Sequence, residues 1–68
     1  MARQVTLMKD LHDELDKLLA DAEDCDLIAS LATDLAKRAT FRRLAAQFRE
    51  MAEQLKADIA ARTASGET

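Results

Sequence analysis

The first half of the chain carries an apolar stripe whose members alternate three and four residues apart without interruption. Its members are Met8, Leu11, Leu15, Leu18, Ala22, Cys25, Ala29 and Ala32. Such alternation is the seam of a helix packed as in a coiled coil. The pattern therefore predicts a first helix over about residues 5–32.

A second stripe with the same spacing lies in the second half. It consists of Phe41, Leu44, Phe48, Met51 and Leu55, and beside it run Ala45, Ala52 and Ile59. Continuing the frame of the first half would put Arg43 on the seam and leave both phenylalanines outside it. Since one straight helix cannot bury both stripes on one face, the sequence predicts a second helix, over about 35–62, that folds back on the first.

The segment between the stripes should contain the chain reversal, at Thr33 and Asp34. An aspartate before a helix can accept hydrogen bonds from the backbone N–H groups two or three residues on, which makes Asp34 the expected N-cap. Neither a glycine nor a proline marks this turn. Two alternatives therefore stay open: Thr40 as the cap after a longer connection, or a continuous helix whose stripes pair between chains in a swapped dimer.

Composition supports helices throughout and one small domain. The chain has 68 residues, no proline and one glycine, Gly66, and it is rich in alanine, leucine and long charged residues, which favour helix over sheet. We expect an all-α antiparallel hairpin over residues 1–63 and a flexible tail over 64–68.

Charge differs between the two halves. Residues 10–26 hold eight acidic side chains and Lys17, whereas residues 37–49 hold five basic side chains and no acidic one. Antiparallel folding places the acidic run beside the basic run, and this complementarity helps to select the hairpin.

A hairpin of this size needs further support. Fourteen of the apolar residues are alanines, and chains below about 70–80 residues usually require disulfides, a metal or oligomerisation. A single cysteine closes no internal disulfide, and no zinc-type spacing is present. We therefore predict that two hairpins form a dimeric four-helix bundle through the bulky side chains of Leu11, Leu15, Leu18, Phe41, Leu44, Phe48, Met51 and Leu55.

Candidate chemistry is sparse. His12 and Cys25 are about 20 Å apart along one helix, so they share no site within a chain, and Cys25 on the seam is expected in the core. No catalytic, phosphate-binding or metal-binding motif is readable, and we expect no enzyme activity, no cofactor and no metal. No run of 18 apolar residues and no signal peptide are visible, and a single thiol fits the reducing cytoplasm.

Nucleic acid is the alternative partner. Lys37, Arg38, Arg42, Arg43 and Arg49 form a basic patch on the second helix. A net charge of −3 and a pI near 5.0 weigh against this alternative. The sequence therefore favours a non-catalytic homo-oligomeric interaction protein, with a regulatory role through a protein partner, over a small RNA- or DNA-binding regulator.

The middle segment, Leu31 to Phe41 followed by Leu44-Ala45 and Met51-Ala52, also resembles a group of small uncharacterised bacterial proteins, common in alphaproteobacteria. Their pattern is LA-x-x-(T/A)-D-P-x-x-R-x-x-(F/L)-x-x-LA…MA. The resemblance covers about residues 25–53 and implies an α-hairpin in which Asp34 caps the second helix. The chain departs from the pattern at Leu35, which stands where the group has proline. The resemblance implies no catalytic residues.

Overall fold

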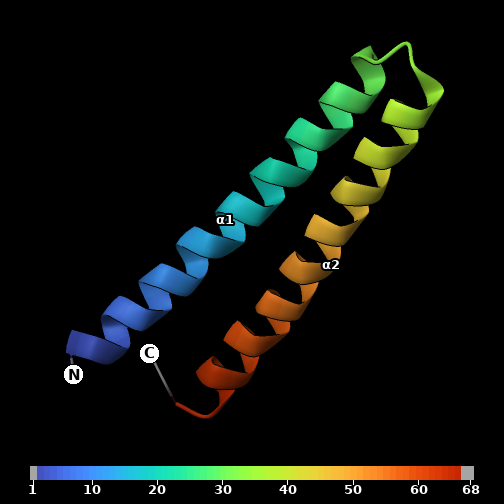
Figure 1. The fold of residues 1–68 in the computed structure, drawn as a ribbon. Helices are drawn as coiled ribbons and strands as arrows, with labels where there is room; N and C mark the ends of the chain where they lie inside the picture. The colour runs from blue at the N-terminus through green and yellow to red at the C-terminus, as the bar shows by residue number, and fades with distance from the viewer. Residues whose placement is uncertain (1, 67–68) are drawn as a thin grey trace.

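The computed structural model describes residues 2–66, with side chains described from residue 7. It contains two helices, α1 (Ala2–Leu31) and α2 (Leu35–Ala64). They lie side by side and antiparallel, so that α1 begins and α2 ends at one end of the molecule, here called the open end (Figure 1). The described residues contain no strand. The predicted all-α hairpin is confirmed, and the alternative of one continuous helix is excluded.

The turn end, opposite the open end, depends on Asp34. Its side-chain Oδ1 accepts hydrogen bonds from the backbone N–H groups of Ala36 at 2.8 Å and Lys37 at 3.3 Å. Asp34 has extended backbone angles, φ −78° and ψ 121°, as an N-cap residue requires. The prediction that Asp34 caps the second helix is therefore confirmed, and the longer connection ending at Thr40 does not form.

Arg38 completes the turn in a way that sequence reasoning did not predict. Its Nη2 donates a hydrogen bond of 2.9 Å to the carbonyl oxygen of Ala32, just beyond the end of α1. A helix end leaves its last carbonyl groups without helical partners, and basic side chains can satisfy them. Arg38 thus satisfies one carbonyl group at the end where a glycine would usually terminate a helix.

The stripe predicted for α1 faces α2. Three of its members are buried, namely Ala22, Cys25 and Ala29, and the other five are half-buried. In a two-helix molecule the contact between the helices is where side chains are shielded from water. The heptad seam of α1 is therefore confirmed.

The inner stripe of α2 differs from the expected one. The buried residues of α2 are Ala45, Ala52 and Ile59, seven residues apart and in frame with Arg38. Met51 is 44% exposed. The stripe that faces α1 consists of Arg38, Phe41, Ala45, Phe48, Ala52, Leu55, Ile59 and Arg62, spaced three and four without interruption. The hydrogen bond of Arg38 to Ala32 therefore lies on the same face of α2 as this buried stripe.

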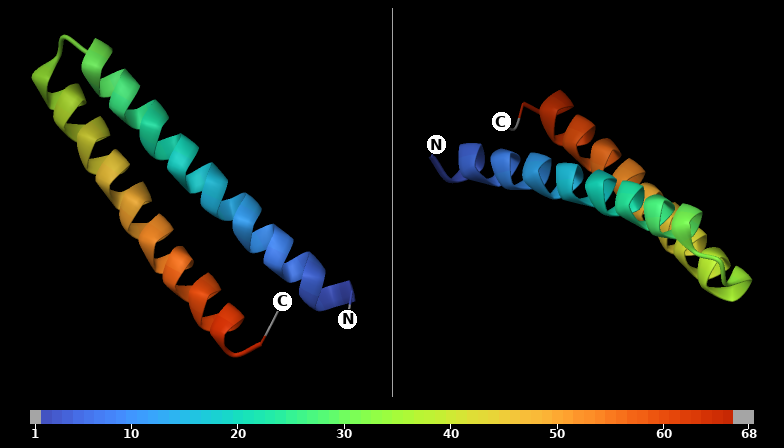
Figure 2. Two further views of the ribbon diagram at one scale, coloured as in Figure 1. Left: turned by 180° about the vertical axis from the view of Figure 1, so that it is seen from behind. Right: turned by 90° about the horizontal axis from the view of Figure 1, so that it is seen from above.

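The hairpin is one helix thick. Its principal extents are 51 × 17 × 11 Å, so the molecule is long and flat, with two helices across its width. Figure 2 shows this single layer from behind and from above, with the helices crossing at a shallow angle. Each helix therefore has one neighbour, and both broad faces of the layer are open.

The shielded core is small. It consists of alanines, Cys25 and Ile59, and among the described residues no large side chain is fully buried. The radius of gyration is 15.4 Å, whereas a compact chain of this length would have about 11 Å. The predicted helix end near residue 62 lies two residues before the observed end at Ala64. Ser65 caps that end, and Gly66 has a φ of +87°. Of the expected flexible tail over 64–68, Glu67 and Thr68 lie outside the described residues.

Candidate interaction surface

One edge of the helix contact carries an ion pair. Arg49 donates through Nη2 to Oδ2 of Asp26, and both side chains are partly exposed. Side chains lean toward the N-terminus of their own helix. In an antiparallel pair, Asp26 therefore leans toward the open end and Arg49 toward the turn, and the two converge. The ion pair connects the acidic run of α1 to the basic run of α2.

Asp26 follows Cys25 on the inner stripe, and Arg49 follows Phe48. The residues that directly follow every seventh stripe position lie on this side of the hairpin. These stripe positions are Leu11, Leu18 and Cys25 on α1 and Phe41, Phe48 and Leu55 on α2. We call this side the charged flank, and its residues are His12, Leu19, Asp26, Arg42, Arg49 and Lys56. Five of these six residues are polar, which is typical of a solvated edge.

The opposite side of the hairpin is here called the mixed flank. It is formed by the residues that directly precede the other stripe positions, which are Met8, Leu15, Ala22 and Ala29 on α1 and Arg38, Ala45, Ala52 and Ile59 on α2. Its members are Leu7, Glu14, Asp21, Ile28, Lys37, Leu44, Met51 and Asp58. Leu7 is 41% exposed, Ile28 39% and Met51 44%, and Leu44 is half-buried. Half of this flank is apolar, and among the described residues Leu7, Ile28 and Met51 of this flank stay exposed.

On α2 the mixed flank continues into a second, outward-facing stripe, here called the outer stripe. Thr40, Gln47, Gln54 and Ala61 lie beside the flank and are all exposed. Together they form a series spaced three and four residues apart, consisting of Lys37, Thr40, Leu44, Gln47, Met51, Gln54, Asp58 and Ala61. The stripe is uncharged between Lys37 and Asp58. A helix face without charges over this length is one on which a second helix can pack.

The corresponding outward positions of α1 do not continue such a surface. Asp10, Lys17 and Asp24 occupy three of them and Leu31 the fourth, and all are exposed. A helix face with charges at this density is typical of contact with water. The uncharged surface available for packing is thus concentrated on α2.

Apolar side chains also surround the turn end. Leu27 is 60% exposed, Leu31 75% and Leu35 74%. These are the most exposed of the large apolar residues described for the chain. None of the three belongs to the outer stripe or to the mixed flank.

The eight residues predicted to form the core or dimer interface fall into two groups. Phe41, Phe48 and Leu55 join the three α1 leucines as half-buried residues between α1 and α2. Leu44 is half-buried as well and lies with the exposed Met51 on the mixed flank beside this contact. The stripe predicted for α2 and the stripe that faces α1 share Phe41, Phe48 and Leu55. Periodicity alone therefore does not separate the residues that face α1 from those beside them.

The four arginines predicted as nucleic-acid contacts do not gather on one surface. Arg38 lies on the inner stripe and is bonded to Ala32, while Arg49 is paired with Asp26. Arg42 lies on the charged flank, and Arg43 follows it on the outward side of α2; both are exposed. The basic patch is therefore divided among three faces of α2.

The remaining chemical groups are isolated. His12 is exposed, and Cys25 is a buried free thiol. No group of three or more potential metal ligands occurs among the described residues. Lys9 donates a 3.0 Å hydrogen bond to Asp13, and this bond, together with the charge of Asp13, raises the pKa of Lys9 above 10.5. Because Lys9 is exposed, this ion pair is a surface feature.

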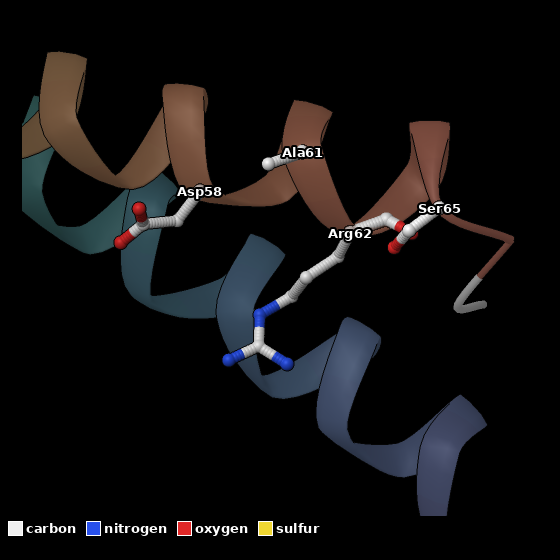
Figure 3. Close-up of a pocket in the computed structure, with 4 residues that line it drawn as sticks. All are labelled: Asp58, Ala61, Arg62 and Ser65. Carbon is white, nitrogen blue, oxygen red and sulfur yellow. The ribbon is translucent and has the colours of Figure 1, made fainter.

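A shallow, open depression lies at the open end. It is lined by Asp58, Ala61, Arg62 and Ser65, all from α2. Figure 3 shows Asp58, Ala61 and Ser65 along one side of α2, with the guanidinium of Arg62 extending toward α1. One helix supplies the entire lining, so the depression does not enclose a ligand.

No protein-family model matches the chain, and the comparisons with curated proteins and with solved structures give no match. The resemblance of the middle segment to small bacterial hairpin proteins therefore stays a prediction. Neither described helix is long and apolar enough to cross a membrane.

Proposed function

We propose that the protein is a non-catalytic interaction protein that works as a homodimer. Two hairpins pack through their apolar surfaces into a four-helix bundle, and the charged faces of the bundle bind a protein partner in a regulatory role. The proposed setting is the cytoplasm, where a single unpaired thiol such as Cys25 stays reduced.

The observation that carries the proposal is the absence of a sufficient core in one hairpin. No large side chain is fully buried among the described residues, and seven large apolar residues are exposed. The accessible surface is 5019 Å², whereas a compact monomer of 7.5 kDa would expose about 4200 Å². The excess of about 800 Å² equals what each partner buries in a typical stable interface.

The role of the charged faces rests on their separation from the apolar surface. α1 contributes eight acidic and three basic residues, and α2 contributes seven basic and three acidic ones. The charged flank would stay exposed in a dimer that uses the mixed flank. A protein partner with complementary charges is thus compatible with dimerisation.

The RNA- or DNA-binding alternative has less support. Phosphate binding requires several basic side chains on one surface, whereas Arg38 and Arg49 already bind groups within the hairpin. The net charge of −3 also repels a polyanion. Filter binding at low salt tests this alternative, and salt-dependent retention of RNA or DNA would favour it over a protein partner.

Two measurements test the proposal. Light scattering coupled to gel filtration should give twice the 7.5 kDa chain mass, and Phe48→Asp should abolish folding and association together. Quantitative pull-down should then compare the wild type with the double variant D13N/D16N, whose two positions are exposed on α1. We expect a partner that is lost from the variant, while the variant remains a dimer. Identical capture by both would contradict the role of the acidic face.

A further inference from the structure

We propose that two copies of the chain pair through the outer stripe of α2, with the two α2 helices antiparallel and a two-fold axis beside Gln47. This inference rests on the proposed dimer and specifies its surface and direction. The outer stripe is selected because it is uncharged between Lys37 and Asp58 and carries the uncovered side chains of Leu44 and Met51, while α1 already occupies the inner stripe.

The sequence of the outer stripe is self-complementary when its direction is reversed. Reversal about Gln47 places Thr40 level with Gln54 of the second copy and Leu44 within one residue of Met51. The same reversal places Lys37 within one residue of Asp58 of the second copy. A two-fold axis generates each of these contacts twice. Every position of the stripe from 37 to 58 therefore meets a partner of compatible chemistry.

A parallel arrangement of the two α2 helices would match the apolar positions equally well but not the charges. Each residue would then meet its own copy, so Lys37 would face Lys37 and Asp58 would face Asp58. Like charges placed together disfavour an arrangement, whereas unlike charges select register and partner direction. The two charges that bound the stripe thus determine its direction.

The mixed flank of α1 is compatible with the same arrangement. Leu7 lies near the open end and Ile28 near the turn end, and both are exposed. Reversing one hairpin relative to the other brings Leu7 of one copy toward Ile28 of the second. The contact thereby extends from the α2 helices to the α1 helices and produces a four-helix arrangement. The charged flank with the Asp26–Arg49 pair stays outside the contact.

Site-specific cross-linking tests the direction directly. In a Cys25→Ala background, single cysteines are introduced as T40C, Q47C and Q54C, all at exposed positions, and treated with a short bis-maleimide. We expect efficient dimer cross-linking of Q47C and little for Q54C alone. In the antiparallel dimer the two Q54C positions lie about 20 Å apart along the helices. Mixing T40C with Q54C should give a mixed cross-linked dimer.

The outcomes separate the inference from the function on which it rests. Light scattering on the same variants shows whether they are dimers before cross-linking. A dimer in which Q54C links to itself as efficiently as Q47C would be parallel and would overturn the inference but not the proposed function. A dimer in which neither position cross-links uses another surface and overturns the inference as well. A folded monomer would overturn both.

A charge exchange provides a second test. K37D and D58K should each weaken the dimer about tenfold, because each replaces two attractive contacts with two repulsive ones worth up to about 1 kcal/mol each. The double variant K37D/D58K restores opposite charges across the axis and should recover most of the affinity. Loss in the single variants without recovery in the double variant would contradict the assigned contact.

Discussion

The guanidinium of Arg38 donates a 2.9 Å hydrogen bond to the carbonyl oxygen of Ala32. The bond joins the first turn of α2 to the end of α1 across three connecting residues. Asp34, the last of these connecting residues, caps the start of α2 by accepting a hydrogen bond from the backbone N–H of Ala36. A turn without glycine or proline is thus held by two side chains with opposite charges.

Removal of the Arg38 side chain should destabilise the hairpin. Arg38→Ala leaves the Ala32 carbonyl without this donor, and hydrogen bonds that involve a charged group contribute about 1.5–3 kcal/mol. We expect a loss of about that size in the free energy of unfolding measured in urea. Arg43→Ala is the control, because Arg43 is exposed and surface substitutions change stability by about 0.5 kcal/mol or less. Equal losses of stability in the two variants would show that the hydrogen bond between Arg38 and Ala32 contributes nothing.

Leu35→Pro should stabilise the protein. Leu35 is the first residue of α2, where proline is favoured, and its side chain is 74% exposed. The extended backbone of Asp34, with ψ 121°, suits a residue that precedes proline. Because proline restricts the unfolded chain, we expect a gain of about 0.4–1 kcal/mol. Thermal unfolding checks this prediction, and a lower melting temperature would mean that the start of α2 is incompatible with proline.

Two neighbouring alanines test which face of α2 turns inward. Ala45 is 0% exposed, whereas Ala46 is exposed. Leucine at position 45 must force the helices apart and should cost about 1–3 kcal/mol. Ala46→Leu should leave the free energy of unfolding within about 0.5 kcal/mol of the wild type. The reverse order of the two effects would place the inner stripe on another frame.

The Asp26–Arg49 pair should contribute little to stability. The two side chains are 37% and 48% exposed, and pairs with such access to water are typically worth about 0–1 kcal/mol. A double-mutant cycle with D26N and R49Q should therefore give a coupling energy in that range at low salt. The coupling should weaken as ionic strength rises. A coupling above about 2 kcal/mol, unchanged by salt, would mean that the pair is effectively buried.

The sequence predicts correctly those elements whose pattern is carried by residues close together in the chain. The α1 stripe is unambiguous because its three-and-four spacing admits one frame, and Asp34 is recognisable because capping needs a short acceptor at the helix start. The inner stripe of α2 was not recognised, because the series through Leu44 and Met51 has the same spacing as the series through Ala45 and Ala52. Side-chain size favours the first series, whereas the structure buries the second.

The contact of Arg38 could not be predicted from spacing. It depends on how far the guanidinium reaches across a three-residue connection, which is a property of the folded turn. The candidate interaction surface was predicted only in part for the same reason. The sequence predicts Leu44 and Met51 as interface residues, whereas the outer stripe is defined by which face of α2 packs on α1, a property of the folded hairpin.

The central claim is that one hairpin is half of a homodimer. Light scattering coupled to gel filtration, carried out over a dilution series, measures this directly. We expect a mass of twice the 7.5 kDa chain, with helical content and mass falling together on dilution because the single hairpin lacks a sufficient core. A mass of one chain at every concentration, with the helical content of the hairpin intact, would contradict it.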